Sequence, residues 1–355
     1  MSWGGKLAIA ALSTVFSLGV AELAVYFLVP VRDLGPSFTV DDPVYGKRIK
    51  ANARITRKTP EFVMEFRTNA QGFRQERIVD NGSGPVIFLG DSFTMGYGVD
   101  EGEQFVALLQ KRLGELSLLN AGMGNNGNGR WLKFLRLAAP AYQPRLVVLQ
   151  VMGNDYEDNV AEGLFELRGG KLLERPVPPR SSSRVLQQVV EAVPGLASSH
   201  LVALWRQVWA VRAPADGQSG AARRDPAAVQ SSTRAVDSST STGDALTLAL
   251  LARAIEICQT NGWPVVGFSV EVTGDRLTRL ERLFASRGLN LLRLPGKQER
   301  PDLYYRVDGH WNAAGHRHAA ETLLPVLREK FPLPNWIAAT TVVDGLAYSS
   351  RPRTR

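Results

Sequence analysis

The feature that most constrains this chain is an alternation of short apolar runs with longer helical stretches. Five apolar runs of four to seven residues, each a candidate buried strand, lie at 86–89, 116–119, 146–151, 264–270 and 291–294. The helical stretches lie at 104–113, at 129–139, from about 244, at 275–286 and at 312–330. Strands that alternate with helices form a parallel sheet covered on both faces. We therefore predict a three-layer α/β/α domain of flavodoxin-like type with about five parallel strands.

Changes in composition set the boundaries of this domain. Residues 31–84 are polar with short aromatic patches, and we interpret them as a connecting segment packed on the domain, which spans 85–335. The stretch between the third strand and the next helix is too long for an ordinary connection, so 160–243 is predicted to be an insertion. Within it, 215–243 has no aromatic residue and is rich in Ser, Thr, Ala and Gly, which predicts disorder. Residues 336–355 form a tail.

An apolar stripe at helical spacing precedes the segment predicted to be disordered. It consists of Leu201, Trp205, Val208 and Trp209. Three interpretations stay open: a lid over a binding site, a surface that rests on a membrane, and simple packing against the domain.

A long apolar run follows Lys6, interrupted only by small or hydroxyl residues and Glu22. A helix of this length rises about 35 Å, which is enough to cross the hydrocarbon core of a bilayer. We predict that 1–30 is an uncleaved signal anchor, because the run continues past Gly19-Val20-Ala21, where a signal peptidase would cut in the alternative case. Charge leaves the orientation open, since Lys6 and Arg32 flank opposite ends of the run.

The net charge of +8 raises the question of a nucleic-acid partner. No zinc-finger, RNA-binding-sheet or basic-zipper pattern is present, so we predict no such partner. The basic residues are scattered except for one cluster: Lys47, Arg48, Lys50, Arg54, Arg57 and Lys58. This cluster is either a face for anionic lipid or glycan or an ordinary solvated surface. Cys258 is the only cysteine, which excludes an intramolecular disulfide and a cysteine-rich metal site.

Polar motifs follow the first three predicted strands and precede the last helix. They are Gly90-Asp91-Ser92, Asn120-Ala121-Gly122-Met123-Gly124-Asn125, Gly153-Asn154-Asp155 and Asp308-Gly309-His310. Ligands of open parallel sheets bind outside the carboxyl ends of the strands, where these motifs are expected to meet.

The residue types of these motifs suit acyl transfer. Ser92 becomes a nucleophile when a base takes its proton, and His310 can be that base. Asp308 can orient the imidazole and stabilise its cation. A tight glycine turn and the Asn154 side chain offer the hydrogen-bond donors that a tetrahedral oxyanion requires.

Together the four motifs resemble the ordered blocks of the SGNH/GDSL hydrolase superfamily, which contribute Ser, Gly, Asn and His. The first thirty residues, segment 69–74 and the sequence GDSFTMGYGV resemble a bacterial, membrane-anchored branch related to polysaccharide O-acetyltransferases and esterases. The resemblance implies a Ser92–His310–Asp308 triad. It also implies an oxyanion hole made by the N–H groups of Ser92 and Gly124 and the side chain of Asn154, without cofactor or metal.

The resemblance further implies an acyl-ester substrate, either an acetylated cell-surface glycan or a lipid. The domain would lie on the periplasmic side of the inner membrane, held by one N-terminal helix. Two alternatives stay open. An O-acetyltransferase would resolve the same acyl-enzyme with a sugar hydroxyl instead of water, and an inactive protein would bind glycans or help assembly at the membrane.

Two features depart from the superfamily pattern. Asp308 and His310 are one residue apart, whereas the common motif places two residues between them; the shorter spacing also occurs among related enzymes. The second motif has no obvious glycine donor for the oxyanion. The candidates are Gly124, Asn125 and Gly127. We predict Gly124.

Other polar residues near the motifs receive structural interpretations. Asp91, Asp155 and Asp158 are expected to stabilise turns. His316 and His318 lie on the last predicted helix and are expected to pack or to face solvent rather than to bind a metal.

Overall fold

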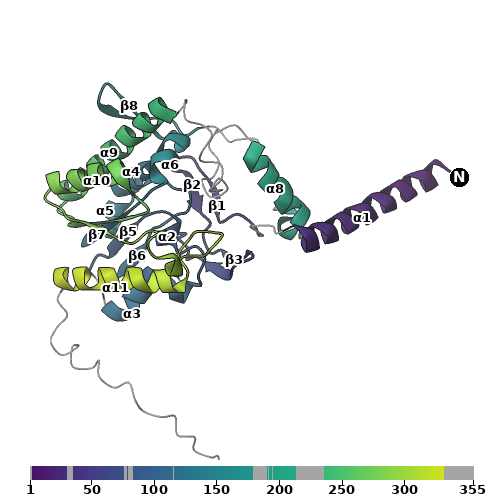
Figure 1. Ribbon diagram of the computed structural model, residues 1–355, viewed down its shortest axis with the longest axis horizontal. Coiled ribbons are helices and arrows are strands. Elements are labelled where there is room, and N and C mark those ends of the chain that lie inside the picture. Colours follow the sequence, from purple (N-terminus) through teal and green to yellow (C-terminus); the bar gives the residue numbers. More distant parts are fainter. Residues whose placement is uncertain are drawn as a thin grey trace, which may run out of the picture.

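A five-stranded parallel sheet forms the centre of the protein (Figure 1). The computed structural model describes residues 2–29, 35–75, 78, 83–114, 116–178, 190, 192–193, 195–212 and 236–331. The strands, in the spatial order β11-β10-β7-β5-β6, are β5 (Val86–Leu89), β6 (Leu118–Asn120), β7 (Leu146–Met152), β10 (Val265–Val270) and β11 (Leu291–Arg293). The predicted α/β fold with five parallel strands is confirmed.

The sheet is covered on both faces, which explains its apolar strands. Every residue of β5, β6, β7 and β10 is buried. Because side chains alternate along a strand, Val86 and Phe88 join one apolar cluster while Ile87 and Leu89 join the other. The first cluster is closed by α3 (Phe105–Leu113) and α11 (Ala313–Lys330). The second is closed by α4 (Asn128–Leu137), α9 (Val236–Thr260) and α10 (Gly274–Ser286).

Strand order determines where the sheet can bind a ligand. The chain enters at β5, adds β6 on one side, and then crosses to β7 on the other. The carboxyl ends of β5 and β7 therefore flank the topological switch point, the usual binding position in a doubly wound sheet. The motifs of Ser92 and Asn154 directly follow these two strands.

The segment upstream of the sheet consists of two antiparallel hairpins. They are formed by β1 (Thr39–Asp42) with β2 (Gly46–Ile49) and by β3 (Arg54–Lys58) with β4 (Val63–Arg67). In β3 and β4 buried residues alternate with exposed ones, as in strands with one dry face. Their apolar side chains, including Met64 and Phe66, pack with Met95 and Met123 of the α/β domain. The sequence interpretation of 31–84 as a connecting segment had not resolved these strands.

The insertion after β7 contains more regular structure than the sequence indicated. It holds the hairpin of β8 (Phe165–Arg168) and β9 (Lys171–Glu174) and the helix α8 (His200–Arg212), and it follows α6 (Asp155–Glu162). Helix α9 begins at Val236, so 236–243 is helical and the predicted disorder is wrong there. Extending a helix that is already packed adds one hydrogen bond per residue without a new nucleus. The rest of that prediction, 215–235, and the tail 336–355 lie outside the described residues.

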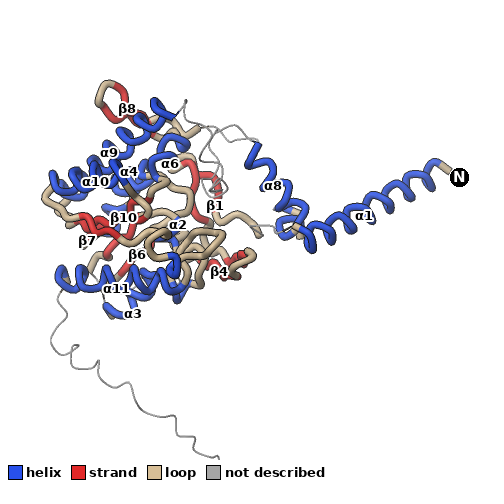
Figure 2. Tube along the Cα trace, viewed as in Figure 1, coloured by secondary structure: helices blue, strands red, loops and turns tan. Residues whose placement is uncertain are grey.

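The N-terminal helix α1 (Trp3–Leu28) is exposed along almost its whole length. Its 26 residues include an 18-residue window with a mean hydropathy of 1.9, which suits a membrane span or a signal sequence. Figure 2 shows α1 apart from the α/β domain, with α8 beside its C-terminal end. The Glu22 carboxylate accepts hydrogen bonds from Ser199 Oγ at 2.7 Å and from the N–H groups of His200 and Leu201 at 2.6 and 3.0 Å. The one acidic side chain of the apolar run thus caps the start of α8.

Candidate active site

Ser92 is held at the end of β5 by a compact turn. It is the first residue of the short helix α2 (Ser92–Met95), which Asp91 caps by accepting from the N–H of Phe93 at 2.9 Å. From β7, Gln150 Oε1 accepts hydrogen bonds from the N–H groups of Asp91 and Thr94 and from Thr94 Oγ1. A Cβ atom on Gly90 would meet Thr94 Oγ1 at 2.1 Å. Glycine is therefore required there, and the turn that presents Ser92 is rigidly packed.

Ser92, His310 and Asp308 form a hydrogen-bonded row. The distance between Ser92 Oγ and His310 Nε2 is 2.8 Å, and that between His310 Nδ1 and Asp308 Oδ1 is 2.5 Å. Gly309 has φ +84°, a left-handed conformation that lets the chain fold back between the two side chains. The structure thus brings together the three residues predicted from the sequence, and the one-residue spacing is compatible with the row.

Two aromatic rings fix the position of the imidazole. The centroid of the His310 ring lies 5.2 Å from that of Phe93 and 4.7 Å from that of Tyr97. Both rings come from the segment that begins at Ser92, so nucleophile and imidazole share one support. Only 13% of the His310 side chain is exposed. Its Nε2 is therefore directed at Ser92 within a largely dry setting.

Gly124 lies beside Ser92 in the turn after β6. A Cβ atom on Gly124 would be 3.5 Å from Ser92 Cβ, and the Gly124 N–H points to the weak acceptor Met95 Sδ at 3.4 Å. Gly127 instead donates its N–H to Glu162 Oε1 at 2.8 Å. Asn125 is exposed and has φ +50°. Of the three candidates, Gly124 is the one whose contacts suit an oxyanion donor.

Asn154 follows β7, the strand next to β5, and its side chain is bound to Asp158. Asn154 Nδ2 donates to Asp158 Oδ2 at 2.7 Å, while Asn154 Oδ1 has no partner among the described residues. This hydrogen bond orients the amide. Burial, helped by Glu162, raises the pKa of Asp158 to about 7, against the opposing effect of Lys47. The partner of the Asn154 amide therefore titrates close to neutrality.

Asp91 and Asp155 are two fully buried carboxyl groups that interact electrostatically. Asp155 Oδ2 accepts from the Met152 N–H and from Asn128 Nδ2, each at 3.0 Å. Burial and the nearby Asp91 raise the pKa of Asp155 well above its usual value. Asp91 and Asp155 both hold backbone N–H groups, in agreement with the turn-stabilising role predicted for them.

Lys47 of the first hairpin supports the turn of Gly124. Its ammonium group donates to the carbonyl oxygens of Gly124, at 3.4 Å, and of Asn125. Nearby, Arg130 pairs with Glu162 and donates to the carbonyl of Tyr45 at 2.7 Å. These contacts tie β1 and β2 to the turn. The sequence had indicated only a basic cluster at 47–58, because contacts to carbonyl oxygens leave no motif.

Glu61, in the turn of the second hairpin, supports the other side of the site. Its carboxylate accepts from the N–H of Asp308 at 2.6 Å and from the N–H of Val307 at 2.9 Å. Phe62 packs against Tyr305, with ring centroids 4.8 Å apart, in the same loop. Sequence reasoning missed Glu61, and no pattern around it signals this role.

His316 is buried beneath the site and does not belong to the Ser92 row. Its Nδ1 accepts from the Phe105 N–H at 3.4 Å, and its ring stacks on Phe105. Burial lowers the pKa of His316 to about 3. Of the two alternatives left open by the sequence, packing or facing solvent, the structure shows packing for His316. In the part of the chain that the structure describes, no group of three or more His, Cys, Asp or Glu side chains could hold a metal ion.

A doubly wound sheet with a Ser–His–Asp row at its switch point has the framework of a serine hydrolase. Residues 88–318, more than half of the chain, match the GDSL-like Lipase/Acylhydrolase family. The chain therefore belongs to this family of ester hydrolases.

Three solved structures match between 68% and 72% of this chain. The crystal structure of TesA is 14% identical and covers 70% of this chain and 99% of its own, with a TM-score of 0.37. The esterase EstA from Pseudoalteromonas sp. is 14% identical, with coverages of 72% and 100% and a TM-score of 0.36. The acetyl xylan esterase AlAXEase is 15% identical, with coverages of 68% and 99% and a TM-score of 0.38. A comparison with curated proteins gave no match.

Proposed function

We propose that the protein is a membrane-anchored serine esterase that removes acyl groups, acetyl groups in particular, from a cell-surface glycan. The observation that carries the proposal is the row from Ser92 Oγ through His310 to Asp308, with distances of 2.8 and 2.5 Å. Nucleophile, base and orienting carboxylate are within hydrogen-bond reach before any substrate binds.

The row supports a two-step reaction. Ser92 Oγ attacks the ester carbonyl while His310 Nε2 takes the hydroxyl proton, and the same proton then passes to the departing sugar oxygen. The acyl group stays on Ser92. In the second step His310 removes a proton from water, the hydroxide attacks the acyl-enzyme, and the carboxylic acid leaves as Ser92 regains its proton. Asp308 holds the imidazole with its proton on Nδ1 and stabilises the cation that forms twice per cycle.

The negative charge of each tetrahedral intermediate requires donors. We assign this role to the N–H groups of Ser92 and Gly124 and to the Asn154 amide. The Gly124 N–H can leave the Met95 sulfur at little cost, because a thioether is a weak acceptor. Asp158 accepts one hydrogen from the Asn154 amide, and the amide nitrogen carries a second for the oxyanion.

A fluorophosphonate probe tests the nucleophile, since it reacts with activated serines. We expect the wild-type protein to be labelled and Ser92→Ala to remain unlabelled, with circular dichroism spectra that match. Release of acetate from acetylated oligosaccharides, followed by wild type and Ser92→Ala, tests the reaction. Equal labelling of both proteins would place the nucleophile elsewhere. Acetyl transfer to an added sugar in place of acetate release would make the protein a transferase.

A further inference from the structure

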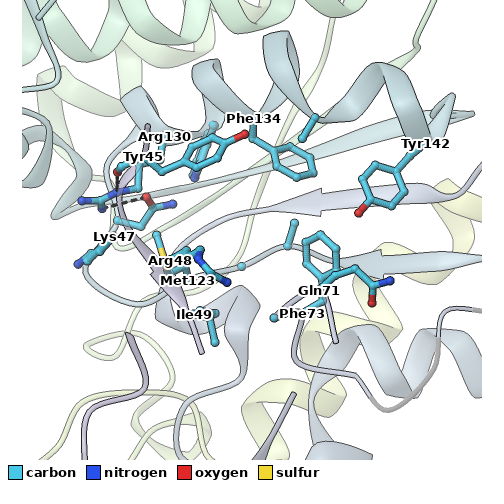
Figure 3. Close-up of a pocket in the computed structure, with 16 residues that line it drawn as sticks. Tyr45, Lys47, Arg48, Ile49, Gln71, Phe73, Met123, Arg130, Phe134 and Tyr142 are labelled. Carbon is cyan, nitrogen blue, oxygen red and sulfur yellow. Dashed lines mark hydrogen bonds between the residues drawn. The ribbon is translucent and has the colours of Figure 1, made fainter. Parts of the chain in front are cut away.

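A cavity of about 240 Å³ (Figure 3) opens beside the Gly124 turn, and none of Ser92, His310 and Asp308 lines it. Its walls come from β2, from the segment around Gln71, from the turn after β6, and from α4 with α5 (Ala139–Tyr142). In Figure 3, Phe134 lies between Tyr45 and Tyr142, and Gln71 and Phe73 face them across the cavity. Seven of the sixteen lining residues precede the family match, which begins at residue 88.

The cavity adjoins the candidate oxyanion turn. Gly122 and Met123 line it and immediately precede Gly124. Lys47, another lining residue, donates to the carbonyl of Gly124 at 3.4 Å. A substrate whose ester lies at Ser92 could therefore extend past the Gly124 turn into the cavity.

Five of the sixteen residues that line the cavity are aromatic. The centroids of Phe73 and Tyr142 are 6.0 Å apart, and Phe134 and Tyr142 lie nearly parallel at 6.4 Å. All three side chains are only half-buried, although they are at the edge of an apolar cluster. Flat apolar faces left open to solvent in a concave site are suited to receive another flat, partly apolar group.

One buried donor in this wall lacks an acceptor. The Trp131 side chain is 1% exposed, and its indole N–H has no partner among the described residues. The hydroxyl groups of Tyr45 and Tyr142 and the exposed Gln71 amide add polar groups to the same cavity. A hydrocarbon acyl chain would leave these groups without partners, which is costly when water is displaced. A sugar ring offers apolar faces and hydroxyl oxygens together.

We propose that this cavity is a glycan subsite, which binds a sugar ring next to the residue whose ester reacts at Ser92. This assignment rests on the proposed function for the identity of the reacting glycan, while binding in the cavity itself needs no turnover. The ring packs against Phe134 and Tyr142, and one of its oxygens accepts the Trp131 N–H. The cavity then selects polymeric glycan esters over small esters of equal reactivity.

Calorimetric titration of the full-length Ser92→Ala protein tests the subsite, because bound esters persist in this variant. The probes are partly acetylated xylopentaose, which is neutral, partly acetylated alginate pentasaccharide, which is acidic, and octanoate, which is an apolar chain. We expect saccharide binding that Phe134→Ala weakens about tenfold or more. Trp131→Phe, which removes only the donor and some bulk, should weaken it about three- to tenfold. Leu137→Ala, an exposed position on the same helix, serves as the matched control and should not change it.

Three results would overturn the subsite: binding of octanoate alone, binding of none of the probes, or saccharide binding that Phe134→Ala leaves unchanged. The melting temperature of Trp131→Phe is measured in parallel, and Phe134→Ala gives an independent test should that variant unfold. Turnover is compared in proteins that keep Ser92. The ratio of kcat/KM for the saccharide to kcat/KM for p-nitrophenyl acetate should be lower in Phe134→Ala than in wild type. Absent turnover with intact saccharide binding would refute the proposed function and leave the subsite standing.

Discussion

Gly309 shows how one residue makes the shortened Asp-x-His motif workable. With φ +84°, it turns the chain so that Asp308 Oδ1 reaches both the N–H and Nδ1 of His310, at 3.3 and 2.5 Å. A side chain in this left-handed region costs roughly 1–2 kcal/mol. The sequence showed a spacing that departs from the common motif, but the backbone angle that compensates for it follows only from the structure.

The Ser92–His310 pair yields the first prediction. Ser92→Ala and His310→Ala should each lower kcat for p-nitrophenyl acetate by roughly four orders of magnitude, and the double variant should be hardly worse than either. The reason is that Ser92 is a weak nucleophile without a base, and His310 as a base has no nucleophile to activate without Ser92. Stopped assays with matched protein concentrations measure the three rates, with His318→Ala as the control. Near-wild-type turnover in His310→Ala would rule out the histidine as the base.

His316 yields a prediction about stability and pH. Burial lowers the pKa of His316 to about 3, and the charges of Arg74 and His310 act in the same direction. In the unfolded chain a histidine has a pKa of about 6.5. The unfolded chain thus binds this proton more readily. The contribution of buried, neutral His316 to the free energy of unfolding is complete above about pH 6.5. It is lost, at about 1.4 kcal/mol per pH unit, as the pH falls toward 3.

His316→Leu removes this titration, so its free energy of unfolding should fall less steeply than that of wild type between pH 6 and pH 4. Urea unfolding at several pH values measures both slopes, and His318→Leu is the matched control on the same helix. Asp158 affects the free energy of unfolding in the opposite sense. Burial raises its pKa to about 7, so the folded state binds this proton more readily and gains stability as the pH falls. Asp158 is present in every variant and cancels in the comparison. Equal slopes for wild type and His316→Leu would contradict the prediction.

At the scale of elements, the sequence identified the sheet and missed the hairpins for a physical reason. Strands buried on both faces are continuous apolar runs, and such runs stand out. In β3 and β4 exposed charged residues such as Arg54 and Glu65 alternate with the buried ones, and over five residues this pattern resembles a polar loop. The early start of α9 was missed because its first two turns are rich in Ser and Thr.

Glu61 yields the prediction for the second hairpin. Glu61→Ala removes the acceptor of the Val307 and Asp308 N–H groups, so the loop that carries Asp308 and His310 should loosen. We expect kcat to fall about tenfold with little change in KM, because the row is displaced rather than the substrate contacts. Kinetics on p-nitrophenyl acetate give both constants.

The control for this prediction is Glu65→Ala, at an exposed position of the same hairpin whose carboxylate pairs with Arg67. Glu61→Gln should recover most of the activity, since an amide oxygen can accept the same hydrogen bonds. A loss of stability without a change in kcat would indicate that Glu61 only supports the fold.

For the molecule as a whole, we propose that α1 stays in the membrane and that the α/β domain lies outside the cytoplasm. The reason is the 26-residue apolar helix, whose one carboxylate is used to cap α8. Protease added to spheroplasts should digest the domain and leave a cytoplasmic marker protein intact. Full protection of the domain while the membrane is intact would reverse the orientation, and recovery of the domain in the soluble periplasmic fraction would indicate cleavage.

The separation in sequence of the supporting groups has a consequence for folding. Ser92 and His310 are 218 residues apart, and Glu61 and Asp308 are 247 apart. Contacts between such distant segments form late, because the entropy of closing long loops must be overcome first. During synthesis both hairpins and the nucleophile emerge long before their partners. Ester turnover should therefore be among the last properties to return on refolding, after the secondary structure, and its recovery reports that the two ends of the domain have met.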